Sequence, residues 1–71
     1  MPVESVYKII ELVGSSEVSW EDAAKKAVEL TSKNVRGLRI AEIVEQDLKV
    51  EDGKVIAYRV RIKLSFKYET A

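Results

Sequence analysis

The side chains that could do chemistry in this chain are carboxylates, amines, guanidinium groups and phenols, because its 71 residues include neither histidine nor cysteine. This composition excludes disulfides, Cys/His zinc sites, cysteine nucleophiles and histidine-based catalysis. The sequence also contains no P-loop, GxGxxG, GxSxG or EF-hand motif. We therefore expect a protein that is not an enzyme.

Glu45 and Asp47 are the residues whose spacing best suits a metal ion. Residues two apart on a β-strand point to the same face, and paired carboxylates can bind a divalent cation or raise one another's pKa. The simpler alternative, which we favour, is that both are solvated charges at a sheet edge or partners for Lys or Arg of another subunit.

A basic stripe near the end of the chain is the candidate surface for nucleic acid. Its members alternate with apolar residues: Arg59, Arg61, Lys63 and Lys67. Acidic residues on the preceding segment neutralise them: Glu42, Glu45, Asp47 and Glu51. The formal charges of the chain also balance, with 12 Lys and Arg against 12 Asp and Glu, whereas phosphate binding favours a basic excess. We therefore expect cross-strand ion pairs and no nucleic-acid partner.

Membrane and secretory signals are not seen in the sequence. The longest apolar runs have four residues or fewer, too short to span a bilayer, and no charged segment followed by an apolar stretch marks a signal peptide. The expectation is a cytoplasmic protein without a membrane partner.

The elements that must position these residues begin with a strand and a helix. The run Val6–Val13 is rich in β-branched residues and ends at Gly14-Ser15-Ser16, which predicts a strand followed by a turn. Apolar residues then recur at helical spacing, which predicts a helix from Ser19, a good N-cap, to about Val35. Gly37 is placed as the glycine that ends this helix, and the alanine-rich stripe of the helix allows close approach to a sheet.

The last two segments, Leu38–Glu51 and Lys54–Tyr68, are predicted to form a hairpin. Asp52-Gly53 between them is the preferred dipeptide of a type I′ turn. A two-residue turn fixes which residues of the two strands lie opposite one another. A bulge, which is plausible in strands this long, would shift these pairs. The expected pairs are Arg59 with Gln46, Lys63 with Glu42, and Ile62 with Ile43.

The chain is accordingly predicted to be a single α+β domain, residues 1–71, of order β-α-β-β, in which a three-stranded antiparallel sheet wraps on one helix. Residues of the hairpin that suit the helix are Ala41, Ile43, Val60, Ile62 and Leu64. Apolar residues on the opposite face are Ile40, Val44, Leu48 and Val50, interspersed with the basic stripe. One helix cannot cover both faces, so the uncovered strip needs a partner chain or a ligand. We therefore expect a homo-oligomer.

Trp20 is the only tryptophan and lies at the start of the predicted helix. It could stack on a ligand, but packing of the helix start onto the sheet is the interpretation we favour.

Taken together, several stretches resemble the dodecins, a family of very small proteins of β-α-β-β order. The similar stretches are Val6-Tyr7-Lys8, Glu11-Leu12-Val13-Gly14-Ser15-Ser16, Ser19-Trp20-Glu21-Asp22-Ala23-Ala24, Ala41-Glu42-Ile43-Val44-Glu45-Gln46, and Tyr58-Arg59-Val60 continuing to Phe66. The resemblance implies a hollow homododecamer with a non-enzymatic role. It also implies binding or storage of a flavin, FMN or riboflavin, as the family ligand.

Two departures from the family pattern bear on that ligand. Ile40 stands where the family has its flavin-stacking Trp, and Arg59 stands where the family has a Gln that hydrogen-bonds the flavin ring. An isoleucine offers no π-face, whereas Arg59 could bind a phosphate or carboxylate or pair with Glu42 or Gln46. Gln46 could itself offer its amide to a ligand.

The departures resemble a branch of the dodecins that lacks the flavin platform and is described as calcium-binding. Calcium takes six to eight oxygen ligands, and the candidate carboxylates here are Glu42, Glu45 and Asp47. A calcium-binding shell, or a structural shell without a tight ligand, is therefore the alternative to flavin storage.

Overall fold

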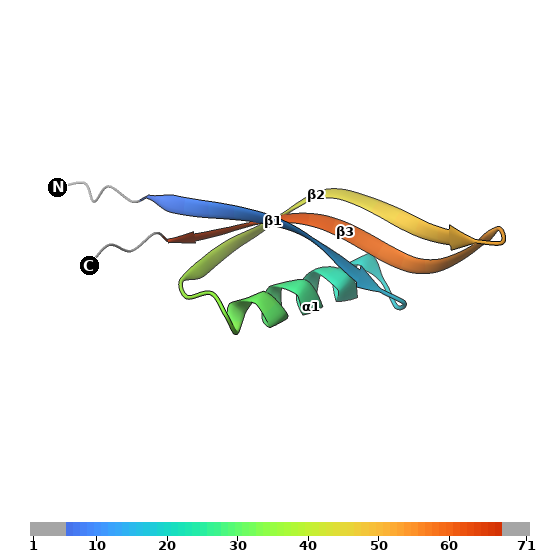
Figure 1. Ribbon diagram of the computed structural model, residues 1–71, viewed down its shortest axis with the longest axis horizontal. Helices are drawn as coiled ribbons and strands as arrows, with labels where there is room; N and C mark the ends of the chain where they lie inside the picture. The colour runs from blue at the N-terminus through green and yellow to red at the C-terminus, as the bar shows by residue number, and fades with distance from the viewer. Residues whose placement is uncertain (1–5, 68–71) are drawn as a thin grey trace.

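Three strands and one helix make up the fold, in the order β1 (Tyr7–Ser16), α1 (Trp20–Ser32), β2 (Leu38–Glu51) and β3 (Lys54–Lys67) (Figure 1). The structure is a computed structural model that describes residues 6–67. The strands form one antiparallel sheet in which β3 lies between β1 and β2. This is the predicted α+β architecture. Tyr68, placed at the end of the last predicted strand, lies outside the described residues.

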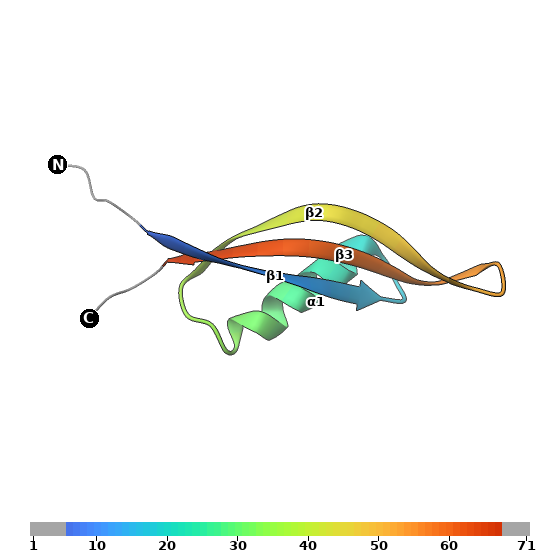
Figure 2. The same cartoon turned by 45° about the horizontal axis from the view of Figure 1, so that its top comes forward.

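The helix covers one face of the sheet, and the core lies between the two. The alternation of β3 directs Val60, Ile62 and Leu64 toward α1, where all three are fully buried together with Ala23. Burial of each large aliphatic side chain contributes about 1.5–3 kcal/mol. The hairpin of β2 and β3 extends beyond the helix, as Figure 2 shows, so its far end lacks this cover.

Strand β1 is longer than predicted, because Gly14 and the two serines after it continue the pairing with β3. A Cβ added to Gly14 would lie 2.7 Å from the backbone oxygen of Ala23 and 3.0 Å from the Cβ of Ala27. The glycine therefore serves close contact between strand and helix rather than a turn, and the small residues of α1 permit that contact, as the alanine-rich stripe indicated.

The start of the helix is fixed from both sides. The Ser19 hydroxyl accepts a hydrogen bond from the backbone N–H of Asp22 (3.0 Å), which confirms Ser19 as the N-cap. The Asp22 carboxylate in turn accepts a hydrogen bond from the hydroxyl of Ser16 (2.6 Å) and pairs with Lys26 (2.9 Å). These contacts tie the end of β1 to the first turns of α1.

The helix ends at Ser32, earlier than the predicted Val35. The chain leaves it through a turn in which Asn34 donates a backbone hydrogen bond to Thr31. Gly37, with φ +76°, does not end the helix as predicted but shapes the connection to β2, and its carbonyl accepts a hydrogen bond from the N–H of Lys67 (3.1 Å). The left-handed residue therefore lies in the connection between α1 and β2 and not at the end of the helix.

The hairpin confirms the turn and corrects part of its register. Asp52 (φ 52°) and Gly53 (φ 74°) both have the positive φ of a type I′ turn. Next to the turn Val50 pairs with Val55, but Lys49 pairs with Ala57, so Ile56 is an extra residue on β3. This irregularity places Asp47, not Gln46, opposite Arg59.

A second irregularity, at Val44, restores the predicted pairs of Ile43 with Ile62 and of Glu42 with Lys63. Between these two positions, residues 45–49 of β2 lie on the opposite side of the sheet from the one predicted. Leu48 consequently lies opposite Tyr58 on the helix side, although it was expected on the other face.

Within residues 6–67, no helix is long and apolar enough to cross a membrane.

Candidate ligand-binding face of the sheet

The sheet face that points away from α1, called here the outer face, carries most of the predicted site residues. Cross-strand pairing arranges its middle as rows across β1, β3 and β2. These rows are Glu11–Lys63–Glu42, Val13–Arg61–Glu45 and Ser15–Arg59–Asp47. Each of these basic residues therefore faces an acidic residue of β2. Arg59 and Arg61 form ion pairs with theirs, which confirms the predicted cross-strand ion pairing for these two residues.

Arg59 and Asp47 form the shortest salt bridge on this face. The Arg59 Nε and terminal NH2 group donate to the two carboxylate oxygens of Asp47 at 2.7 and 2.8 Å, the two-pronged geometry typical of arginine with carboxylate. Hydrogen bonding by Arg59 holds the pKa of Asp47 below its usual value, and the same bond raises the pKa of Arg59. Both groups are therefore charged at neutral pH.

Asp47 is also held from the helix side of the sheet. The indole N–H of Trp20 donates to the backbone carbonyl of Asp47 (3.1 Å). The Trp20 ring lies edge-on against Tyr58 with the ring centres 5.3 Å apart, a favourable aromatic geometry. Trp20 thus packs the start of the helix onto the sheet, as predicted.

Arg61 links the two edge strands. It contacts Glu45 of β2 at 2.9 Å and Glu11 of β1 at 3.9 Å. Glu45 and Asp47 do share a face, as their spacing predicted, but each is paired with an arginine of its own chain rather than with the other.

One end of the outer face is apolar. Ile9 and Ile40 lie on either side of Ser65, with which both pair, and about 60 % of each isoleucine is exposed. Tyr7 and Val13 of β1 add further exposed apolar surface on this face. Of the predicted strip, Ile40 is confirmed on this face and Leu48 is not, because it lies on the helix side. The rest of the exposed apolar surface described here comes from β1.

The remaining predicted contacts are separated by the register. Gln46 lies opposite Val60 on the helix side, so its pairing with Arg59 was wrong, as was a pairing of Arg59 with Glu42, which faces Lys63. Ile40 and Arg59 share the outer face as expected. Ile40 pairs with Ser65, however, which lies about 20 Å from Arg59 along β3, at about 3.3 Å per residue. A single chain does not bring the two together around one ligand.

The carboxylates of the outer face were the predicted metal ligands. Among residues 6–67, no group of three or more acidic residues is clustered to hold a metal ion. Glu42 shares the outer face with Glu45 and Asp47, and within the described residues it forms no ion pair.

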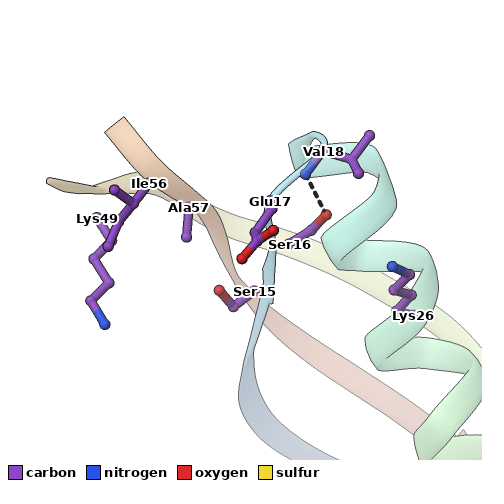
Figure 3. Close-up of a pocket in the computed structure, with 8 residues that line it drawn as sticks. All are labelled: Ser15, Ser16, Glu17, Val18, Lys26, Lys49, Ile56 and Ala57. Carbon is purple, nitrogen blue, oxygen red and sulfur yellow. Dashed lines mark hydrogen bonds between the residues drawn. The ribbon is translucent and has the colours of Figure 1, made fainter. Parts of the chain in front are cut away.

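A groove that sequence analysis did not identify lies between the end of β1, the start of α1 and the hairpin (Figure 3). It has a volume of about 450 Å³, and its polar lining includes Ser15, Glu17, Lys26 and Lys49. Lys26 is held by Asp22. The groove is assembled from segments far apart in the sequence, so no local motif announces it.

Comparison with known proteins places this geometry in a family. The family model for dodecin matches residues 6–69. Calcium dodecin of Mycobacterium tuberculosis is 42 % identical over 67 residues, which cover 94 % of each chain. Together with the three-stranded sheet on one helix, these matches show that the chain belongs to the dodecin family.

Solved structures agree with this assignment. Dodecin from Streptomyces coelicolor superposes with a TM-score of 0.88 at 31 % identity, covering 94 % of this chain and 96 % of that one. A crystal structure of the calcium dodecin of M. tuberculosis, described as calcium-chelating with a novel calcium-binding site, gives a TM-score of 0.81 at 41 % identity, again covering 94 % and 96 %.

Proposed function

We propose that this chain assembles with copies of itself into a hollow homododecamer that binds a small ligand without catalysing a reaction, and that the ligand is calcium rather than flavin. The proposal is carried by one observation, the exposed apolar surface on a sheet that one helix shelters on one side only. Ile9, Ile40 and Val13 on the outer face are each more than half exposed. A monomer rarely leaves such a surface uncovered.

The edges of the sheet support self-association as well. β1 and β2 are both edge strands, and every residue of β2 after Leu38 is exposed. An apolar groove of about 320 Å³ runs where β1 meets α1, lined in part by Leu12, Ala27 and Leu30. A domain of this size has a core worth only about 3–5 kcal/mol, for which oligomerisation is a common remedy.

A non-catalytic role follows from the available groups. The chain has no histidine or cysteine, and Glu45 and Asp47 are neutralised by arginines rather than poised as an acid and a base. Such an outer face can present charges to a ligand, but its arginine-bound carboxylates are not placed to transfer a proton.

Calcium is favoured over flavin by Ile40 and by the carboxylates. Ile40 replaces the aromatic platform that the resemblance implies for flavin, and it provides no ring on which a flavin could stack. Glu42 forms no ion pair within residues 6–67 and can offer the oxygen ligands that calcium prefers, and symmetry would multiply this carboxylate where subunits meet. Glu45 and Asp47 lie nearby on the same face, where calcium would have to compete with their arginines. The relative named calcium dodecin is consistent with this choice.

Native mass spectrometry of the purified protein tests the assembly and any retained ligand in one measurement. We expect a single species with the mass of twelve chains, whereas a compact monomer at micromolar concentration would refute the proposal.

Calcium and flavin are then separated by two titrations. Calcium should raise the melting temperature and EDTA should reverse the increase, and replacing Glu42 by Gln should reduce the effect. Riboflavin or FMN fluorescence should not be quenched by the protein, and quenching at micromolar concentrations would favour flavin instead. The double variant Ile40→Trp with Arg59→Gln should gain flavin affinity if an assembled pocket exists.

A further inference from the structure

Arg59 is the residue of the outer face best suited to bind an anionic ligand, yet its binding groups are already occupied. A free arginine presents a planar fork that binds the two oxygens of a phosphate or carboxylate. Here the Asp47 carboxylate occupies that fork with hydrogen bonds of 2.7 and 2.8 Å. The side chains of both residues remain about half exposed, so a ligand arriving from solvent would compete directly with Asp47.

The register of the hairpin decides that the residue facing Arg59 is acidic. If the hairpin paired without irregularity, the neutral Gln46 would face Arg59 instead. The extra residue Ile56 shifts the pairing, so that Asp47 takes that place.

The backbone of Asp47 is anchored independently of its carboxylate. Its carbonyl accepts the hydrogen bond from the Trp20 indole (3.1 Å), and Trp20 is itself packed against Tyr58. The Asp47 backbone is consequently fixed at the position from which its carboxylate reaches Arg59.

We propose that Asp47 is a specificity-determining residue that acts as a built-in competitor at Arg59 and excludes small molecules bearing a phosphate or carboxylate from the outer face. The inference rests on the proposed function, because it concerns which ligands the outer face admits. It also gives the face a second reason, besides Ile40, to select against FMN.

The test compares FMN, which carries a phosphate, with riboflavin, which does not, by fluorescence titration of the assembled protein. In Asp47→Ala, FMN fluorescence should be quenched with an apparent affinity at least on the order of tenfold tighter than the detection limit at which the original chain shows no quenching, the increase expected from one or two charge-assisted hydrogen bonds. Riboflavin should stay unquenched by both proteins, and inorganic phosphate should displace FMN. Trp20 fluorescence and native mass should match those of the original chain, since the backbone anchor of Asp47 is retained.

Glu45→Ala is the matched control. It removes the same charge from the same face and strand, but Arg61 keeps Glu11 as a neighbour. Equal gains in the two variants would reduce the effect to net charge and overturn the inference. So would the absence of a gain in Asp47→Ala, or a gain that persists when Arg59→Gln is added to it. Asp47→Asn, which keeps the shape of the side chain, provides the same comparison should the alanine variant not assemble.

The outcome is separable from the proposed function. A phosphate-dependent gain in Asp47→Ala alongside no response of the original chain to calcium would refute calcium binding and leave the role of Asp47 intact. A calcium response without that gain would do the reverse.

Discussion

The contact between Gly14 and α1 makes a sharp prediction about how the sheet and helix are held together. In Gly14→Ala the new methyl group would lie 2.7 Å from the backbone oxygen of Ala23. That oxygen belongs to a helical peptide and cannot swing away as a side chain could, so β1 and α1 must separate slightly. Overpacking of this kind typically costs about 1–3 kcal/mol. Each kcal/mol lowers the melting temperature of a domain this size by about 4–8 °C, which gives an expected decrease of about 4–24 °C.

Circular dichroism melting measures this decrease. Ser15→Ala is the control, because Ser15 is exposed on the opposite face of the same strand and should change the melting temperature by little. A second variant, Gly14→Ala with Ala27→Gly, relieves only the 3.0 Å contact with the Ala27 Cβ and should recover little stability. A Gly14→Ala protein that melts with the original chain would refute the close packing of β1 on the helix.

Three further predictions concern the start of the helix. Ser19→Ala removes the N-cap hydrogen bond and should cost about 1 kcal/mol in urea unfolding, whereas Ser32→Ala, at the exposed end of the helix, serves as its control; equal losses would contradict the capping role. Hydrogen bonding by Ser16, and then by Lys26, lowers the pKa of Asp22, so its contribution to stability is present above pH 3.8 and is lost as the pH falls through its lower folded value. Asp22→Asn should therefore flatten the pH dependence of unfolding below pH 3.8 relative to Glu21→Gln, and identical profiles would contradict this. Trp20→Phe keeps an aromatic ring but loses the indole N–H and its hydrogen bond to Asp47. It should speed amide hydrogen exchange around Asp47 without unfolding the core. Unchanged exchange there would show that the indole hydrogen bond is dispensable.

Much of the fold could be predicted because local patterns and tertiary contacts agree. Asp52-Gly53 selects a turn with two positive φ angles, and the strict alternation of β3 separates its buried aliphatic residues from its basic ones. Ser19 and the apolar spacing after it define the start of the helix. Each of these signals depends on neighbours close in sequence, which is why sequence alone reveals them.

The errors arise where distant segments decide the structure. Gly14 resembled a turn residue, but it lies within a strand. A glycine is needed there because α1 packs too closely to leave room for a side chain. The extra residues Ile56 and Val44 have no signal in the alternation of either strand, because a bulge is defined by the pairing of two segments. The shift by one residue at Ile56 placed Leu48 on the helix side and put Asp47 instead of Gln46 opposite Arg59.

The irregularities at Val44 and Ile56 also decide how the charges of the central strand are balanced on the outer face. Between them, β2 presents Glu45 and Asp47 opposite Arg61 and Arg59, and each acid contacts its arginine at 2.9 Å or less. With the uninterrupted register, the partner of Arg59 would be an uncharged amide, and Asp47 would lie on the side of the core. The shift therefore gives Arg59 a carboxylate in place of an uncharged partner, and this cancels the charge of that arginine on the outer face. A face balanced in this way can be covered by another copy with little repulsion, so this register also favours the proposed assembly.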